Sequence, residues 1–263
     1  MNKTQECIRN NPGLLSLFLS AGYPDMQRFE KLLKATEEAG VKLVEIGIPF
    51  SDPLADGETI QHSSRVALDS GFQIDRLFDL LKRNPCGTGA RVIMTYLNPV
   101  LVYGLERFLL ELNGCKIDSV IIPDLPIDLY ERDYLSLFKK HDVSPVFMIA
   151  PGTTPERIRK IDQLSNSFIY AVSANAITGE KKGFSKEQLD YFLRLSNYGF
   201  RVPVLAGFGI SEPGDMEVIL RYFHGGICGS AFLKHLERLE FSKESPAGFI
   251  KKFTNKNSYD YST

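Results

Sequence analysis

Cysteine is scarce in this sequence, and the few cysteines that occur are far apart. The chain has four, and no two of them show the Cys-x-x-Cys spacing of a zinc site. A disulfide framework is typical of short secreted chains with closely spaced cysteine pairs, which this scattered set does not resemble. We therefore expect no metal site, and reduced thiols at Cys7, Cys86, Cys115 and Cys228.

The sequence also lacks an excess of positive or negative residues. Lys and Arg total 31 while Asp and Glu total 32, which gives a formal net charge of -1. A chain with this balance has no overall field that would gather nucleic acid or an anionic membrane surface. We expect neither as a partner, and any site for an anion has to be built locally.

Long hydrophobic runs are also missing. The first residues, MNKTQECIRNNPG, lack the apolar centre of a secretory signal, and the run LLSLFLSAG is short. A membrane-spanning helix needs about 20 apolar residues. The sequence thus favours a cytoplasmic location.

What the sequence does contain is a regular alternation of short apolar runs and amphipathic stretches. With 263 residues, 43% of them hydrophobic, we expect a single domain over residues 1–263 with its core at about 13–241. Stretches such as DMQRFEKLLKATEEAG have apolar residues every three or four positions and predict helices. The eight runs that we interpret as strands are LLSLFLS, VKLVEIGI, ARVIMTYL, DSVIIP, VSPVFMIA, SFIYAVS, RVPVLAG and GGICGS.

Eight strand and helix units without a break in composition favour an α/β fold of the (β/α)8 TIM barrel type. An open, doubly wound sheet remains the alternative, because counting repeats does not separate the two. The segment before Gly13 predicts an extra N-terminal helix, and the segment after Phe241 predicts a tail rich in Lys, Asn and Ser. Active sites of such barrels lie at the C-terminal ends of the strands, so polar residues that follow a strand are the candidates for function.

The second predicted strand carries a carboxylate. In VKLVEIGI the side chains alternate, so the aliphatic residues Val44, Ile46 and Ile48 share one face, and Glu45 lies on the other. The aliphatic face should pack against helices, which directs Glu45 into the barrel lumen. Burial raises the pKa of a carboxyl group and suits it to proton transfer near neutral pH. A structural ion pair is the alternative interpretation.

A second carboxylate follows the same strand. Asp56 stands before Gly57 in the loop SDPLADG, where an Asp-Gly pair by itself is explained by a turn. Its position after the strand of Glu45 lets the two carboxylates face each other across a pocket. Such a pair can divide the roles of proton donor and acceptor.

Glycine-rich loops follow the last three strands. ITGEKKG, AGFGIS and CGSAF all place glycines where the chain turns toward a helix. Barrels of this kind commonly bind phosphate there, through backbone N–H groups and a helix N-terminus. Three such loops together favour a small substrate that carries a phosphate group over simple turns.

The order of several motifs resembles the tryptophan synthase alpha subunit family. VEIGIPFSDPLADG carries the IPFSDPxADG pattern of that family, with LFLSAGYPD before it and IPDLP, GFGIS and GSA after it. The resemblance covers nearly the whole chain and implies cleavage of indole-3-glycerol phosphate to indole and glyceraldehyde 3-phosphate. It also implies an α2β2 heterotetramer with a beta subunit that carries pyridoxal phosphate and uses the indole to make tryptophan. This chain would need no cofactor of its own.

On this resemblance Glu45 is the general acid and base, and Asp56 is its partner at the indole nitrogen. Protonation of indole carbon 3 and removal of a glycerol hydroxyl proton release the aldehyde, and one carboxyl group can serve both steps. The Asp56 carboxylate would stabilise the positive charge on the ring nitrogen. The reaction requires no lysine Schiff base.

The resemblance also assigns binding roles. Without it, the aromatic residues would be ordinary core and the partner-facing positions simple turns. The implied sets are Gly179, Gly209, Gly229 and Ser230 at the phosphate; Phe18, Tyr170 and Phe208 around the indole; and Asp52, Pro53, Asp124 and Pro126 facing the beta subunit.

One loop departs from the family pattern. After the sixth strand the family has Gly-Val-Thr-Gly, in a loop that closes over the substrate and whose threonine holds the catalytic aspartate. Here the residues are Ala176, Ile177, Thr178 and Gly179. The Cβ of Ala176 removes backbone freedom, so one alternative is a subunit with reduced turnover that mainly activates the beta subunit. Another phosphate-binding barrel, such as a sugar phosphate isomerase, is a further alternative, because the fold alone does not exclude it.

Overall fold

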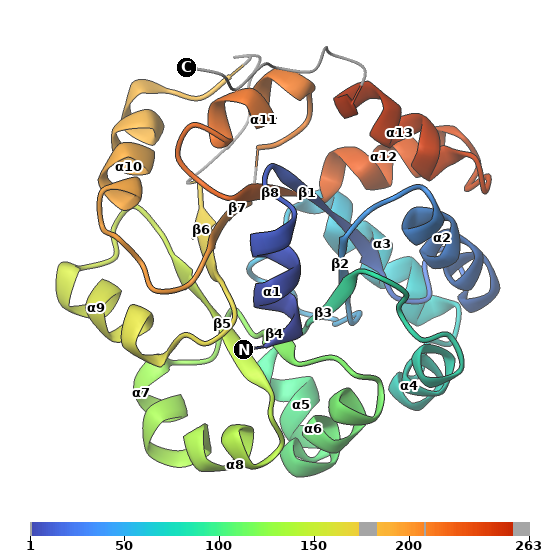
Figure 1. The fold of residues 1–263 in the computed structure, drawn as a ribbon. Helices are drawn as coiled ribbons and strands as arrows, with labels where there is room; N and C mark the ends of the chain where they lie inside the picture. The colour runs from blue at the N-terminus through green and yellow to red at the C-terminus, as the bar shows by residue number, and fades with distance from the viewer. Residues whose placement is uncertain (1, 174–182, 208, 255–263) are drawn as a thin grey trace.

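The chain forms a closed barrel of eight parallel strands. The computed structural model describes residues 2–173, 183–207 and 209–254. Each strand pairs with the next in parallel, and β8 closes on β1 (Figure 1). The predicted (β/α)8 barrel is confirmed, and the open sheet is excluded. The strands are β1 (Leu14–Ser20), β2 (Leu43–Gly47), β3 (Ala90–Met94), β4 (Ser119–Ile121), β5 (Ser144–Ile149), β6 (Ile169–Val172), β7 (Val204–Gly207) and β8 (Gly225–Cys228).

Helices surround the strands and bury one apolar face each (Figure 1). In α4 the buried residues are Leu77, Phe78, Leu80 and Leu81, which recur at the spacing of one helix face. The helices are α1 (Lys3–Asn10), α2 (Met26–Glu38), α3 (Glu58–Asp69), α4 (Ile74–Arg83), α5 (Leu97–Tyr103), α6 (Leu105–Gly114), α7 (Ile127–Leu129), the π-helix η1 (Tyr130–Tyr134), α8 (Leu135–Lys140), α9 (Pro155–Leu164), α10 (Lys186–Ser196), α11 (Pro213–Ile219), α12 (Ser230–Arg238) and α13 (Ser245–Thr254).

The alternation along β2 separates the inside of the barrel from its outside. Leu43 belongs to the apolar cluster of the lumen, whereas Val44 and Ile46 belong to the larger cluster between strands and helices. Glu45 is two residues after Leu43 and so lies on the lumenal side. Its register partners are Phe18 of β1 and Val92 of β3.

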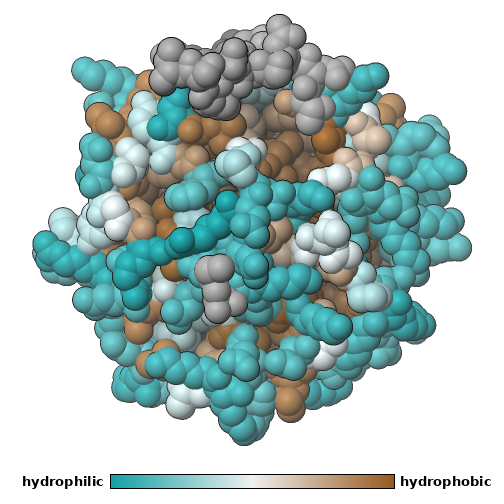
Figure 2. Space-filling view, viewed as in Figure 1, coloured by the Kyte–Doolittle hydropathy of each residue, from teal (hydrophilic) through white to brown (hydrophobic). Residues whose placement is uncertain are grey.

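The N-terminal helix covers the N-terminal end of the barrel. The side chain of Asn2 donates to the hydroxyl of Ser119 at the start of β4 (2.9 Å), and the hydroxyl of Thr4 donates to Asp118 (2.6 Å). Figure 1 views the barrel from this end, with α1 in front of the strands. Most side chains on this face are hydrophilic (Figure 2). The predicted extra helix is therefore present, and it closes one end of the barrel.

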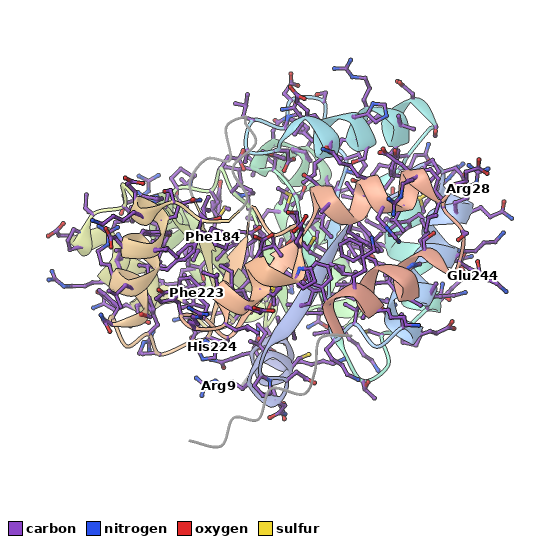
Figure 3. The ribbon with its side chains drawn as sticks, turned by 90° about the horizontal axis from the view of Figure 1, so that it is seen from above. Arg9, Arg28, Phe184, Phe223, His224 and Glu244 are labelled. Atoms are coloured by element: carbon purple, nitrogen blue, oxygen red, sulfur yellow. The ribbon has the colours of Figure 1, made fainter. Side chains whose placement is uncertain are left out.

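The end of α1 is fixed near the start of β8. Arg9 donates to the backbone oxygen of Arg201 (2.8 Å) and lies close to His224, the residue before β8 (Figure 3). Burial lowers the pKa of His224, and the charge of Arg9 adds to the effect. Arg9 is thus held by the backbone beside a histidine that stays neutral at pH 7.

The C-terminal segment differs from the sequence prediction. The ten residues of α13 form a helix where a tail was expected, so the tail prediction is wrong for this segment. The helix packs through Phe249, which is buried and lies 5.1 Å from the ring of Phe232 on α12. Residues 255–263 lie outside the described residues, and a single domain over residues 1–263 stays a prediction. None of the described helices is long and apolar enough to cross a membrane.

Candidate active site

Glu45 is a buried carboxyl group in the middle of β2, on the lumenal side. It is 5% exposed, and among the described residues its Oε2 has no hydrogen-bond partner. Burial raises the pKa of Glu45 to about 8, and the negative charge of Asp56 contributes to the rise. An orphaned buried polar atom is costly and calls for an explanation, which a ligand in the lumen would supply. The alternative of a structural ion pair has no support in the described part of the chain.

Asp56 reaches the same part of the lumen from the loop after β2. The hydroxyl of Tyr96 donates to its Oδ2 (3.0 Å), and the same hydroxyl accepts from the N–H of Ala55 (3.0 Å). Burial raises the pKa of Asp56 to about 6, while the Tyr96 hydrogen bond lowers it. The N–H of Asp56 also donates to the backbone oxygen of Pro53 (3.0 Å), so the turn interpretation describes its backbone but not its side chain.

The two carboxyl groups have different protonation states at neutral pH. With pKa values of about 8 and about 6, Glu45 is mostly protonated and Asp56 is mostly ionised. Environments that separate two pKa values in this way set up one acid and one base within a single pocket. The site can therefore donate a proton and stabilise a nearby positive charge at the same pH.

Tyr96 is a site residue that sequence reasoning missed. It follows β3, and its ring packs 5.2 Å from the ring of Phe50 in the loop after β2. The sequence offers one signal, a tyrosine near the C-terminal end of the predicted strand run ARVIMTYL, which is the functional end of the barrel. Its hydrogen bond to Asp56 joins residues 40 positions apart, which no local pattern predicts.

Two aromatic rings lie in the lumen because glycines on neighbouring strands leave space for them. A Cβ on Gly47 would lie 2.4 Å from the Phe18 ring, and one on Gly207 would lie 2.0 Å from the Tyr170 hydroxyl. Burial and then the charges of Glu45 and Asp56 hold the pKa of Tyr170 well above its usual range. These rings form flat apolar walls next to the carboxyl groups. Phe208, the third predicted wall residue, lies outside the described residues.

The loops after β7 and β8 place the remaining glycines at the same end of the barrel. Gly209 has a φ of +84°, which favours glycine, and Gly229 precedes Ser230, the first residue of α12. A Cβ on Gly229 would lie 3.5 Å from the Cβ of Phe18, so this helix N-terminus begins beside the aromatic wall. It offers backbone N–H groups to an anion. Thr178 and Gly179, like Ala176, lie outside the described residues.

The predicted partner-facing residues lie on loops around the same rim. Asp52, Asp124 and Pro126 are exposed, and Pro53 is half-buried. The carboxylate of Asp124 accepts from the N–H of Leu97 (2.8 Å), the first residue of α5, so it has a structural role as well. The barrel thus presents its site and these loops to solvent on one side.

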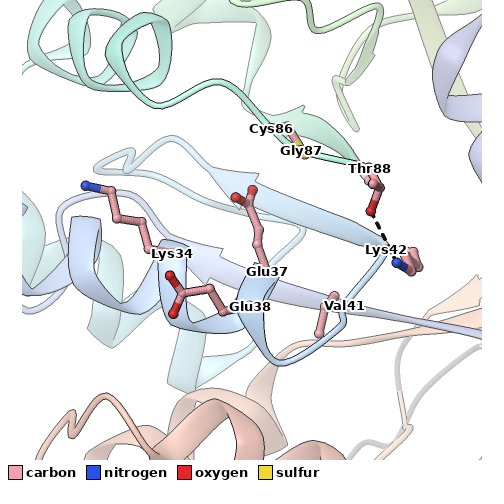
Figure 4. Close-up of a pocket in the computed structure, with 9 residues that line it drawn as sticks. Lys34, Glu37, Glu38, Val41, Lys42, Cys86, Gly87 and Thr88 are labelled. Carbon is pink, nitrogen blue, oxygen red and sulfur yellow. Dashed lines mark hydrogen bonds between the residues drawn. The ribbon is translucent and has the colours of Figure 1, made fainter.

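An open cleft of about 300 Å³ lies at the opposite end of the barrel (Figure 4). It is formed by the end of α2 and by the residues that precede β2 and β3. Two of its charged side chains are paired, Lys34 with Glu30 (2.8 Å) and Glu37 with Arg91 (2.6 Å). This cleft is therefore distant from Glu45, and we assign it no catalytic role.

The cysteine thiols lie apart from the site chemistry. No group of three or more His, Cys, Asp or Glu side chains in the described ranges is placed to hold a metal ion. The four cysteines are free, and burial raises the pKa of each thiol, for Cys115 to about 11. They are thus neutral at physiological pH and poor nucleophiles.

Comparison with known proteins identifies a family. The family model of the tryptophan synthase alpha chain matches residues 4–259. The tryptophan synthase alpha chain of Flavobacterium johnsoniae is 43% identical over 96% of this chain and 98% of its own, and that of Christiangramia forsetii is 41% identical over the same shares. Among solved structures, a tryptophan synthase complex of Pyrococcus furiosus has a TM-score of 0.82 at 31% identity, covering 92% of this chain and 98% of its own. Aminoacrylate-bound tryptophan synthase of M. tuberculosis has a TM-score of 0.83 at 27% identity, covering 96% and 98%. This chain belongs to the tryptophan synthase alpha chain family.

Proposed function

We propose that Glu45 and Asp56 carry out the retro-aldol cleavage of indole-3-glycerol phosphate in this chain. The chain is a lyase of the tryptophan synthase alpha family and releases indole and glyceraldehyde 3-phosphate. The observation that carries the residue assignment is the buried carboxyl group of Glu45, whose Oε2 has no hydrogen-bond partner among the described residues and whose pKa is raised to about 8 beside Asp56. The family match over residues 4–259 favours this lyase over a sugar phosphate isomerase.

The proton transfers of the reaction fit a protonated Glu45 and an ionised Asp56. Protonated Glu45 transfers its proton to indole carbon 3, which turns the ring into an indolenine cation. The Asp56 carboxylate stabilises the positive charge on the ring nitrogen. The Glu45 carboxylate then takes the proton of the neighbouring glycerol hydroxyl, the carbon–carbon bond breaks, and its electron pair restores the aromatic ring. Glu45 is protonated again at the end, so one group serves as acid and base.

We assign the binding roles on the same geometry. Phe18 and Tyr170 are proposed to enclose the indole ring, because they are the aromatic walls beside the carboxyl groups. Gly209, Gly229 and Ser230 are proposed to hold the phosphate through backbone N–H groups and the N-terminus of α12. The roles of Phe208, Thr178 and Gly179 stay predictions.

The rim around the site is proposed to contact a beta subunit. Leu54, which follows the predicted contact residues Asp52 and Pro53 in the loop after β2, is 94% exposed. An apolar side chain so fully exposed in the loop that carries Asp56 supports a protein partner at this rim. Asp124 and Pro126 complete this predicted surface in an α2β2 assembly. Pyridoxal phosphate would belong to the partner, since the proton transfers above require no cofactor in this chain.

Two further interpretations stay predictions. Reduced turnover with retained activation of the beta subunit depends on Ala176, and the comparisons do not favour it over the full activity. Its test is indole release by the unaltered chain beside an Ala176→Gly variant, with the beta subunit present. A cytoplasmic location likewise stays a prediction.

Glu45→Gln tests the proposed function. The amide keeps the shape of the side chain but cannot transfer the proton, so we expect kcat for indole release to fall by about 100- to 10,000-fold. Binding to the beta subunit should persist. Glu38→Gln is the control, because it alters a carboxylate at the cleft on the opposite end and should leave kcat unchanged. Indole release by Glu45→Gln at a rate near that of the unaltered chain would contradict the assignment.

A further inference from the structure

The buried carboxylate of Asp215 holds the loop after β7 through hydrogen bonds. Asp215, the third residue of α11, is 9% exposed, and its Oδ2 accepts three hydrogen bonds. The donors are the N–H of Ser211 (2.8 Å), the hydroxyl of Ser211 (3.2 Å) and the N–H of Glu212 (2.9 Å). All three lie within four positions of Asp215. The carboxylate therefore closes a small ring that fixes the backbone just before α11.

The upstream part of the same loop is packed against β8. A Cβ on Gly226 would lie 2.4 Å from the Cδ1 of Ile210 and 2.7 Å from the Sδ of Met216, so both side chains rest on the strand. The thiol of Cys228 also donates to the backbone oxygen of Ile210 (3.2 Å). Gly209 immediately precedes this anchored segment. Glycine adopts the φ of +84° seen at Gly209 readily, so the anchored residues after it can select this conformation without strain.

We propose that Asp215 is a positioning residue for the phosphate end of the substrate. It holds loop 209–212 in the conformation that directs the N–H of Gly209 toward the phosphate, and this rests on the proposed function of Gly209. Asp215 does not touch the phosphate itself, because two like charges would repel. It occupies the N–H groups of Ser211 and Glu212, so the donors that this loop offers to the substrate lie upstream at Gly209.

Asp215→Ala tests this role by removing the acceptor. Two backbone N–H groups lose their partner, and the loop is free to leave its conformation. We expect the KM for indole-3-glycerol phosphate and the inhibition constant of glycerol 3-phosphate to rise together by about tenfold, with kcat within about twofold. The dissociation constant of indole, which has no phosphate, should not change. Asp215→Asn keeps one acceptor oxygen and should restore most of the affinity.

A second variant and a control separate positioning from stability. Asp215→Glu retains the charge in the first turn of α11 but displaces the carboxylate oxygen by one methylene. The variant should therefore fold, and the inhibition constant of glycerol 3-phosphate should still rise by about threefold or more. Asp25→Ala removes a carboxylate at the N-terminus of another helix, α2, where it caps the helix by accepting from the N–H of Arg28 (2.8 Å). It should lower stability but leave the inhibition constant of glycerol 3-phosphate unchanged.

The outcomes distinguish this proposal from the proposed function. If Asp215→Ala or Asp215→Glu folds and binds glycerol 3-phosphate as the unaltered chain does, the positioning role is wrong. A fall in kcat at constant KM would overturn it as well. Ser230→Pro tests the phosphate site separately, because it removes the backbone N–H at the first position of α12, where proline is tolerated. An unchanged inhibition constant there would show that the phosphate is placed wrongly, whatever Asp215 does.

Discussion

The outer and lumenal faces of the barrel carry buried charge in opposite ways. On the outer face, the side chain of Arg91 is 1% exposed, donates to Glu37 of α2 at 2.6 and 3.0 Å, and donates to the backbone oxygen of Asn84 (2.6 Å). On the lumenal face, Glu45 is buried almost as deeply, and its Oε2 has no partner among the described residues. The charge of Arg91 is compensated by its partners, whereas Glu45 is mostly protonated and therefore neutral at pH 7.

The difference shows how one fold separates stability from chemistry. A buried side chain can stay charged when an opposite charge and hydrogen-bond acceptors compensate for the lost water, as Glu37 and Asn84 do for Arg91. An unpaired carboxyl group is driven to the protonated form, and its pKa moves into the range where it can give and take a proton at neutral pH. We therefore expect a change on the outer face to affect stability and a change on the lumenal face to affect activity.

Arg91→Ala should have the larger effect on stability. It leaves the partly buried carboxylate of Glu37 and the oxygen of Asn84 without their partner, so the free energy of unfolding should fall by about 3–5 kcal/mol. The kcat for indole release, measured on folded protein, should stay within about twofold because Arg91 lies on the outer face of the barrel and shares no partner with Glu45. Urea unfolding monitored by circular dichroism gives the first quantity.

The matched control lies on the same helix as Glu37. Lys34 pairs with Glu30 at 2.8 Å, but the Lys34 side chain is 47% exposed, so Lys34→Ala should cost less than about 1 kcal/mol. A loss for Arg91→Ala as small as that for Lys34→Ala would show that burial does not set the value of the pair.

Tyr96→Phe should have a smaller effect than Arg91→Ala, and the effect should be on activity and not on stability. The variant removes the donor to Asp56, so the pKa of Asp56 rises and less of it is ionised at pH 7. One lost hydrogen bond corresponds to about a fivefold loss in kcat/KM at that pH. The acid limb of the pH profile of kcat/KM should move to higher pH, with activity recovering as the pH is raised.

Tyr103→Phe provides the comparison for Tyr96. Its hydroxyl donates to Asp75 (2.6 Å) on the exposed surface. Tyr103→Phe therefore also removes a tyrosine–carboxylate hydrogen bond, but one that involves no group of the site. The pH profile of this variant should match that of the unaltered chain. An acid limb that does not move in Tyr96→Phe would show that the tyrosine does not control Asp56.

The strands and the direction of Glu45 could be predicted because they depend on short-range periodicity. Alternation along β2 is a local property, and it places Glu45 opposite Val44 and Ile46 before any contact is known. The position of the site at the C-terminal ends follows from the barrel itself. These are the features that one segment of sequence determines by itself.

Contacts between distant segments could not be predicted. Tyr96 meets Asp56 only after β2 and β3 are paired, and Gly207 matters only because Tyr170 crosses it from the neighbouring strand. The helix α13 was missed for the same reason, since the burial of Phe249 against α12 is a tertiary effect.

The protonation state of Glu45 is the quantity on which the mechanism depends. Carbon-13 NMR of the glutamate carboxyl groups, assigned by the signal lost in Glu45→Gln, would follow its titration in the ligand-free chain. We expect the signal of Glu45 to titrate near pH 8, so that the group is mostly protonated at pH 7. A titration midpoint near the ordinary glutamate value of about 4.3 would contradict the assignment of Glu45 as the acid of the first step.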